Sequence, residues 1–269
     1  MAVAGGVAIL LLVGILLAVI PKNEGSTARK EVSKKKVRKE KAYSYTASET
    51  DRASQNKEER TSSAPPPTET VVAQTKPSVF LVWNGYAKAS GSAFAVTSHD
   101  LLTNRHVVEK CPIGGTLFIW NSSWGKLSEK TIRKATLLKR SPSHDVAWLE
   151  LEDEGVKPLP VVDNDAMQGS RVYALGFPGY TREITNDDSP DVTFSDGRVK
   201  SRQRQYNGNP CYETSAEISP GNSGGPLLNE YGRVIGLNTF QAQQFSSYLA
   251  VKIQVVAEDF PELWRKMNP

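Results

Sequence analysis

Short apolar runs separated by turns rich in glycine, proline and asparagine fill the chain from Lys76 onward, and helical periodicity is almost absent there. Many short strands joined by such turns are typical of antiparallel sandwiches and barrels. The pattern therefore predicts an all-β domain. The expected strands cover residues 78–83, 92–97, 116–120, 132–139, 146–151, 171–175, 192–200, 234–240 and 247–251.

The last part of this domain has a different pattern. Apolar residues recur at helical spacing from Ile253 to Trp264, which predicts an amphipathic closing helix over residues 252–267. Pro261 lies inside this stretch and has no backbone N–H, so we expect it to kink or split the helix. The whole domain is then expected to span residues 76–269.

The N-terminal end is set apart because residues 1–20 contain no charged side chain. The apolar run from Ala2 to Ile20 ends at Pro21, and as a helix it would span about 28 Å, close to the hydrocarbon thickness of a bilayer. A cleaved secretory signal peptide starts with basic residues, has a shorter apolar core and ends in small residues. Since those features are missing, the sequence favours an uncleaved transmembrane anchor over residues 1–21.

Residues 22–75 are basic and end in a Pro-rich stretch, and we expect them to be a disordered stalk because they hold few large apolar side chains. Of the chain's 33 Lys/Arg and 29 Asp/Glu, 13 and 8 lie in residues 22–76, which leaves 20 basic and 21 acidic residues elsewhere. The folded part is therefore near neutral, and nucleic acid is not an expected partner. The basic run suits anionic lipid headgroups, and it favours a cytoplasmic location for the residues after the anchor.

Cysteine and histidine usage limits the chemistry of the domain. The two cysteines, Cys111 and Cys211, permit one disulfide and require none. The chain has three histidines and no Cys-x-x-Cys pair, so we expect no metal site.

A glycine-rich stretch, Ile218–Leu228, holds Ser223 between glycines and prolines. A serine nucleophile needs its hydroxyl held on a sharp turn, beside backbone N–H groups that meet a developing oxyanion. Glycine permits such a turn and a close approach of the substrate. The N–H groups of Gly221 and Ser223 would be the donors. Taken alone, the stretch also fits an ordinary loop between two strands.

Two further residues complete a possible nucleophilic site. His106 follows a strand and a turn, and Asp145 opens the apolar run that ends near residue 151. Serine-based hydrolysis needs a base within reach of the hydroxyl and a carboxylate to orient that base. Each of these residues alone also has an ordinary structural explanation. The hypothesis of a nucleophilic site therefore depends on the presence of all three together. His99 and His144 are weaker candidates for the base.

Five motifs together resemble the trypsin-like serine proteases, most closely the bacterial HtrA/DegP type. They are Gly-Ser-Ala-Phe-Ala-Val at 91–96, Thr-Asn-Arg-His-Val-Val at 103–108, His-Asp-Val-Ala-Trp-Leu at 144–149, Gly-Ser-Arg-Val-Tyr-Ala-Leu-Gly-Phe-Pro at 169–178 and Gly-Asn-Ser-Gly-Gly-Pro-Leu at 221–227. The resemblance covers roughly residues 76–260.

The resemblance implies a chymotrypsin-like pair of six-stranded antiparallel barrels, at about 76–160 and 161–252, with an active site between them. His106 would be the general base, Asp145 its orienting carboxylate and Ser223 the nucleophile, with Gly221 and Ser223 forming the oxyanion hole. No cofactor is implied, and the substrate would be a protein or peptide. Family habit places such a domain outside the cytoplasm, against the charge argument.

Two departures from the family pattern are informative. HtrA-type proteins usually carry a PDZ domain after the protease, whereas only 46 residues follow Ser223 here, so we expect none. Glu217 stands where trypsin-like enzymes place the residue at the base of the primary specificity pocket. A buried carboxylate there would favour Lys or Arg before the cut bond; the alternative is that Glu217 faces solvent.

The sequence thus predicts a membrane-anchored serine endopeptidase. One alternative is a protease-fold binding module, tethered to the membrane, that has no turnover. Another is a membrane-surface protein that acts through its basic stalk. The oligomeric state does not follow from the sequence.

Overall fold

The computed structural model describes residues 64–152, 155–163, 165–179, 190–242 and 247–268. The expected anchor at residues 1–21 and most of the expected stalk lie outside these ranges. Within them, none of the helices has the length and apolar character needed to cross a bilayer.

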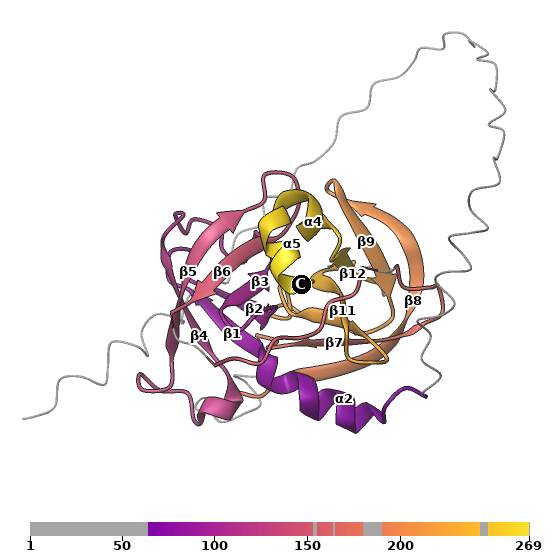
Figure 1. Cartoon of the computed structure of the whole chain (residues 1–269), viewed down its shortest axis with the longest axis horizontal. Helices are drawn as coiled ribbons and strands as arrows, with labels where there is room; N and C mark the ends of the chain where they lie inside the picture. The colour runs from indigo at the N-terminus through magenta and orange to yellow at the C-terminus, as the bar shows by residue number, and fades with distance from the viewer. Residues whose placement is uncertain (1–63, 153–154, 164, 180–189, 243–246, 269) are drawn as a thin grey trace, which may run out of the picture. The chain divides into compact units, whose positions relative to one another are not determined.

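Two closed barrels of six antiparallel strands form the domain, as the resemblance implied (Figure 1). The first has the strand order β1-β2-β3-β6-β5-β4 and contains β1 (Val79–Asn84), β2 (Ala89–Ala95), β3 (Asp100–Thr103), β4 (Thr116–Trp120), β5 (Arg133–Arg140) and β6 (Ala147–Leu151). The second has the order β10-β11-β12-β9-β8-β7 and contains β7 (Arg171–Gly176), β8 (Thr193–Tyr206), β9 (Asn209–Thr214), β10 (Pro226–Asn229), β11 (Val234–Ala242) and β12 (Ser247–Lys252). Two single-turn 3₁₀ helices, η1 (Lys76–Ser78) and η2 (Ser122–Trp124), precede β1 and follow β4.

All nine expected strands are present, and β8 is longer than predicted. The strands β3, β9 and β10 were not predicted. β3 and β10 have four residues each, too few to show a period. β9 begins with Asn209 and Pro210, residue types that are depleted in strands.

Apolar side chains fill each barrel, and a further buried cluster joins the two. In this cluster Trp120 from β4 contacts Phe177, which follows β7, with ring centroids 6.0 Å apart in an edge arrangement. Both rings are almost fully buried. Burying a large apolar side chain contributes about 1.5–3 kcal/mol to the free energy of folding. The contact between the barrels therefore stabilises the domain as the core of each barrel does.

The prediction of disorder is wrong for the last residues of the expected stalk, because Thr68–Thr75 forms α2, drawn in indigo in Figure 1. Val71 is buried, and a Cβ on Gly232 would lie 3.2 Å from its Cγ1. The hydroxyl of Thr68 lies 3.1 Å from that of Tyr173 on β7. A short helix with so few apolar residues is stabilised by the barrel, and composition averaged over the whole stretch does not reveal it.

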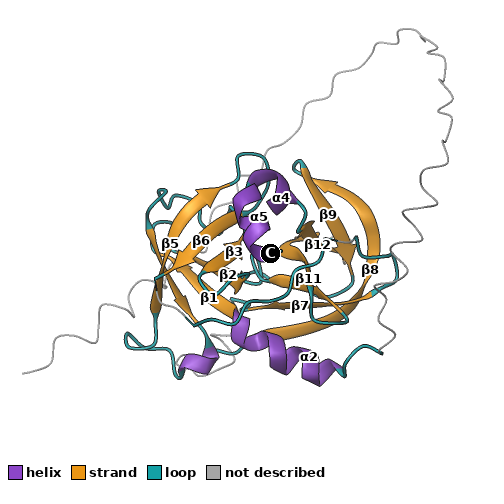
Figure 2. Ribbon diagram, viewed as in Figure 1, coloured by secondary structure: helices purple, strands orange, loops and turns teal. Residues whose placement is uncertain are grey.

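The closing helix is split, as the proline predicted, into α4 (Val255–Asp259) and α5 (Pro261–Met267) (Figure 2). Both helices follow the last strand of the second barrel but pack against the first. Phe260 lies beside Trp148 of β6, with ring centroids 6.2 Å apart. Lys266 contacts the carboxylate of Asp100, which is 5% exposed. The end of the domain therefore returns to the first barrel.

The thiols of Cys111 and Cys211 are free and buried. Burial raises the pKa of Cys111, and it raises that of Cys211 to about 12. Because the thiolate is the nucleophile, we expect neither thiol to react with iodoacetamide in the native domain at pH 8, and both to react in guanidinium. Mass spectrometry counts the added groups. Fast modification of the native protein, or none after denaturation, would contradict this assignment.

Candidate active site

His106 lies in a turn directly after β3 and faces the loop before β6. Its Nδ1 is 2.8 Å from Oδ2 of Asp145, and its backbone N–H donates to Oδ1 at 3.0 Å. A carboxylate only accepts, so this contact places a proton on Nδ1 and, in the neutral ring, leaves Nε2 as an acceptor. The His106 side chain is 49% exposed and that of Asp145 is 14% exposed. The imidazole is therefore oriented by Asp145 on its Nδ1 side, while about half of the side chain is open to solvent.

Asp145 receives a further hydrogen bond from the second barrel. The hydroxyl of Thr239 on β11 donates to Oδ2 at 2.6 Å. Burial acts to raise the pKa of Asp145, but the hydrogen bonds from His106 and Thr239, with the charge of His106, hold that pKa below its ordinary value. The carboxylate is thus kept in its charged form.

The loop that carries Ser223 needs its glycines. Gly221 and Gly224 have φ values of +100° and +86°, in the left-handed region. A Cβ on Gly221 would lie 2.5 Å from the amide nitrogen of Gly179, and one on Gly224 would lie 2.1 Å from the carbonyl oxygen of Ser92. A side chain at either position would force the loop apart.

Ser92 of the first barrel fixes this loop. Its N–H donates to the carbonyl of Ser223 and its hydroxyl to the carbonyl of Gly221, both at 2.8 Å. The hydroxyl of Ser223 donates to the carbonyl of Thr239 at 3.1 Å. Within the described ranges no hydrogen bond joins Ser223 to His106. Thr239 is therefore the residue that contacts both Asp145, through its side chain, and Ser223, through its backbone.

In residues 221–225, two backbone amides have no acceptor among the described residues, those of Gly221 and Ser223. Their neighbours are bonded: the N–H of Asn222 donates to Ser219, and that of Gly224 donates to Asn238, each at 2.9 Å. The two amides predicted as oxyanion donors are thus the ones left with donor capacity.

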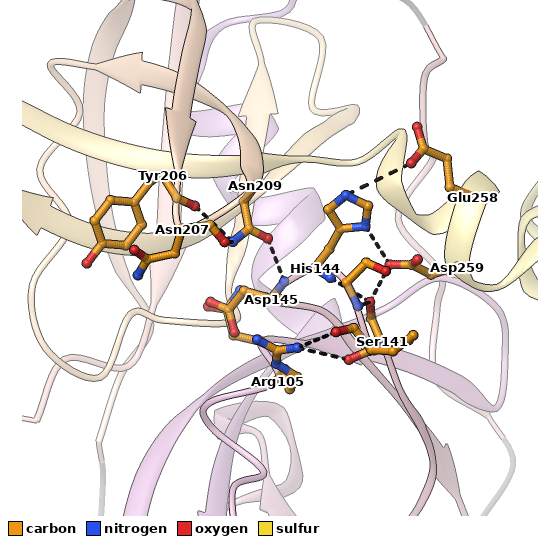
Figure 3. Close-up of polar contacts among 12 residues, drawn as sticks. Arg105, Ser141, His144, Asp145, Tyr206, Asn207, Asn209, Glu258 and Asp259 are labelled. Atoms are coloured by element: carbon orange, nitrogen blue, oxygen red, sulfur yellow. Dashed lines mark hydrogen bonds and ion pairs between the residues drawn. The ribbon is translucent and has the colours of Figure 1, made fainter.

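A cavity of about 320 Å³ opens beside the histidine, and Figure 3 labels some of the residues that line it. It is lined by Arg105, His106, Asp145, Tyr206, Asn207, Asn209 and Thr239. Sequence analysis missed most of these residues. The Asn207-Gly208 pair, with φ of +49° and +81°, is a hairpin signal that would have placed the β8–β9 turn. No local signal marks Thr239 or Asn209, whose roles come from contacts with distant Asp145.

Glu217 lies apart from this cavity and is exposed. Its backbone N–H donates to the hydroxyl of Ser195 at 2.6 Å. The hypothesis of selectivity for Lys or Arg needs a buried carboxylate, and the structure places this side chain at the surface instead. We therefore assign Glu217 no role in the site.

Comparison with known families agrees with this geometry. Residues 91–237 match the family model described as "Trypsin-like peptidase domain". A "Probable periplasmic serine endoprotease DegP-like" of Pseudomonas putida is 30% identical over 156 residues, which cover 57% of this chain and 29% of that protein. "Protease Do-like 5, chloroplastic" of Arabidopsis thaliana is 31% identical over 163 residues, which cover 58% of this chain and 49% of that protein. The chain spans less than half the length of these two relatives.

A solved structure shares the fold. The active form of the Rv3671c protease from M. tuberculosis superposes with a TM-score of 0.61 at 23% identity. The superposition covers 75% of this chain and 88% of that chain.

The lowered pKa of Asp145 predicts a pH-dependent contribution to stability. Because the pKa of Asp145 is lower in the folded state than its unfolded value of about 4, the carboxylate stabilises the fold above about pH 4. This contribution is lost as the pH falls through the folded-state pKa. Asp145→Asn should lower the free energy of unfolding at pH 7 by roughly 1–3 kcal/mol. In urea titrations, the difference in the free energy of unfolding between the wild type and Asp145→Asn should become smaller from pH 7 to pH 3. A gap that widens toward pH 3 would contradict the assignment.

Proposed function

The chain belongs to the trypsin-like peptidase family, with relatives of the HtrA/DegP type, and on that premise we propose that it is a serine endopeptidase acting through Ser223, His106 and Asp145. The observation that supports this proposal is the contact of Asp145 with His106 at 2.8 Å, beside a glycine-framed serine loop. Thr239 contacts both the carboxylate and the serine hydroxyl.

In the proposed reaction, the Ser223 hydroxyl first leaves the Thr239 carbonyl by rotation about Cα–Cβ and donates to Nε2 of His106. Catalytic hydrogen bonds are often formed only in the substrate complex. His106 then takes the proton as the oxygen attacks the peptide carbonyl, and Asp145 stabilises the charged imidazole. The N–H groups of Gly221 and Ser223 bind the oxyanion, a contribution of about 3–4 kcal/mol per donor in comparable sites.

Breakdown of the tetrahedral intermediate uses the same proton path in reverse. His106 gives its proton to the leaving amine, which breaks the peptide bond and leaves an acyl ester on Ser223. A water then gives a proton to His106 and attacks the ester, and His106 passes this proton to the Ser223 oxygen as the ester bond breaks, which releases the acid and restores the free serine. No step requires a metal or an organic cofactor.

The N-terminal run Ala2–Ile20 would anchor this domain to a membrane, with the peptidase on the extracytoplasmic side. The uncharged composition and length of the run support the anchor. The description of the Pseudomonas putida relative as periplasmic supports the extracytoplasmic side. The basic residues after the run favour the other side.

Loss of Ser223 should abolish the activity. We expect Ser223→Ala to lower peptide hydrolysis by on the order of 10⁶-fold and to prevent labelling by a fluorophosphonate, because the nucleophile is gone. The matched control is Ser98→Ala. Ser98 is exposed and its hydroxyl lies 2.8 Å from Nδ1 of His99, so it is also a serine beside a histidine, but it has no glycine-framed loop. The control should keep full labelling.

Other outcomes of this experiment identify the alternatives. If the wild type folds but neither takes the label nor cleaves a peptide mixture, the chain is a binding module with a protease fold. If Ser223→Ala keeps the label, the nucleophile is elsewhere and the proposed triad is wrong.

The membrane proposal has a separate test. The full chain expressed in a Gram-negative host should stay in the membrane pellet after carbonate extraction, because its anchor is integral. The variant lacking residues 2–20 should be released. With the outer membrane opened and the inner membrane intact, a membrane-impermeant fluorophosphonate should label the full chain. Labelling only after the inner membrane is lysed would place the domain in the cytoplasm.

A further inference from the structure

The segment that carries Asp145, residues 141–146 between β5 and β6, is called here the aspartate loop. Ser141 shapes it from within. Its N–H donates to the carbonyl of Val146 at 3.0 Å, and its hydroxyl oxygen accepts the N–H groups of Ser143 and His144 at 3.0 and 2.7 Å. The loop conformation thus depends on how the Ser141 hydroxyl is held.

Asp259, at the end of α4, holds that hydroxyl from outside the barrel (Figure 3). Its Oδ2 accepts from the hydroxyl of Ser141 at 2.5 Å and lies 2.8 Å from Nδ1 of His144. The side chains of Asp259 and His144 are only 8% and 13% exposed. The Ser141 hydroxyl therefore donates one hydrogen bond and accepts two, which is its full capacity. Through Asp259, His144, the residue before Asp145, is also bonded to the C-terminal helices.

Other elements contact the aspartate loop in a different way. Arg105 donates through Nη1 to the carbonyls of Ser141 and Pro142, and the side chain of Asn209 accepts the N–H of Asp145 at 2.6 Å. Arg105 and Asn209 also line the cavity beside His106, whereas Asp259 does not. Asp259 thus contacts the aspartate loop without lining the cavity.

We infer that Asp259 is a positioning residue for Asp145, so that a single carboxylate of the C-terminal segment, residues 255–267, holds the aspartate loop of the peptidase in place. This inference rests on the proposed function. Without the Asp259 carboxylate, the hydroxyl of Ser141 and Nδ1 of His144 lose their buried acceptor, and the loop that presents Asp145 to His106 loosens. A displacement of about 1 Å at a catalytic group can cost as much as 10²-fold in rate.

The test compares two substitutions at this position. Asp259→Ala should lower kcat by about 10- to 100-fold and leave KM within twofold, because the residue is remote from the cavity. Asp259→Asn keeps an oxygen that accepts from Ser141 and His144, so it should retain kcat within about threefold. The rate of fluorophosphonate labelling should follow kcat in both variants.

A control separates positioning from general destabilisation. Phe260→Leu, at the next residue, weakens the packing of the same segment on Trp148 but leaves the polar contacts of the aspartate loop in place. It should lower Tm and keep the wild-type kcat at a temperature where the protein is folded. The inference is overturned if Asp259→Ala keeps kcat within twofold, or if both variants lose activity in proportion to their unfolded fraction.

A readout independent of turnover distinguishes this inference from the proposed function. The hydrogen-bonded Nδ1 proton of His106 gives a low-field proton NMR signal that Asp145→Asn should remove. Asp259→Ala should weaken or shift that signal, and Phe260→Leu should not. If the wild type has the signal but no turnover, the proposed function fails and this measurement still decides the positioning role. An unchanged signal in Asp259→Ala would overturn it.

Discussion

Ser92 joins the two barrels at the point where the serine loop must be held. Its N–H and hydroxyl donate to two carbonyls of that loop, its hydroxyl oxygen accepts the N–H of Phe177, and its carbonyl accepts the hydroxyl of Thr103. The residue has no exposed surface. A buried polar group without a partner would cost about 1–3 kcal/mol, so the loop and the strand specify each other's position. The placement of Ser223 therefore depends on a strand of the opposite barrel.

The same dependence recurs on the other side of the cleft. Asp145 belongs to the first barrel, but its carboxylate and its N–H are bonded by Thr239 and Asn209 of the second. Interactions of this kind are directional, unlike apolar packing, so they fix the orientation of one barrel relative to the other as well as their contact.

Local pattern predicted an all-β domain because strands and glycine turns leave a signal within a few positions, and the arrangement in two barrels followed from the resemblance to trypsin-like serine proteases. The unpredicted parts have a common cause. α2 forms because Val71 finds a surface on the second barrel, and Thr239 and Asp259 matter through partners 94 and 115 or more positions away. For Glu217 the sequence left a buried and a solvent-facing side chain as alternatives, and the side chain is exposed. A single sequence carries no signal for contacts of such length.

The return of α4 and α5 to the first barrel bears on how the protein matures. A nascent chain emerges with its first barrel leading, and that barrel can fold while later residues are still inside the ribosome. His106 and Asp145 would already be present at that stage, but Asp259, which holds the aspartate loop, follows the last strand of the second barrel. The contacts of Asp259 with Ser141 and His144 can therefore form only after both barrels have been translated.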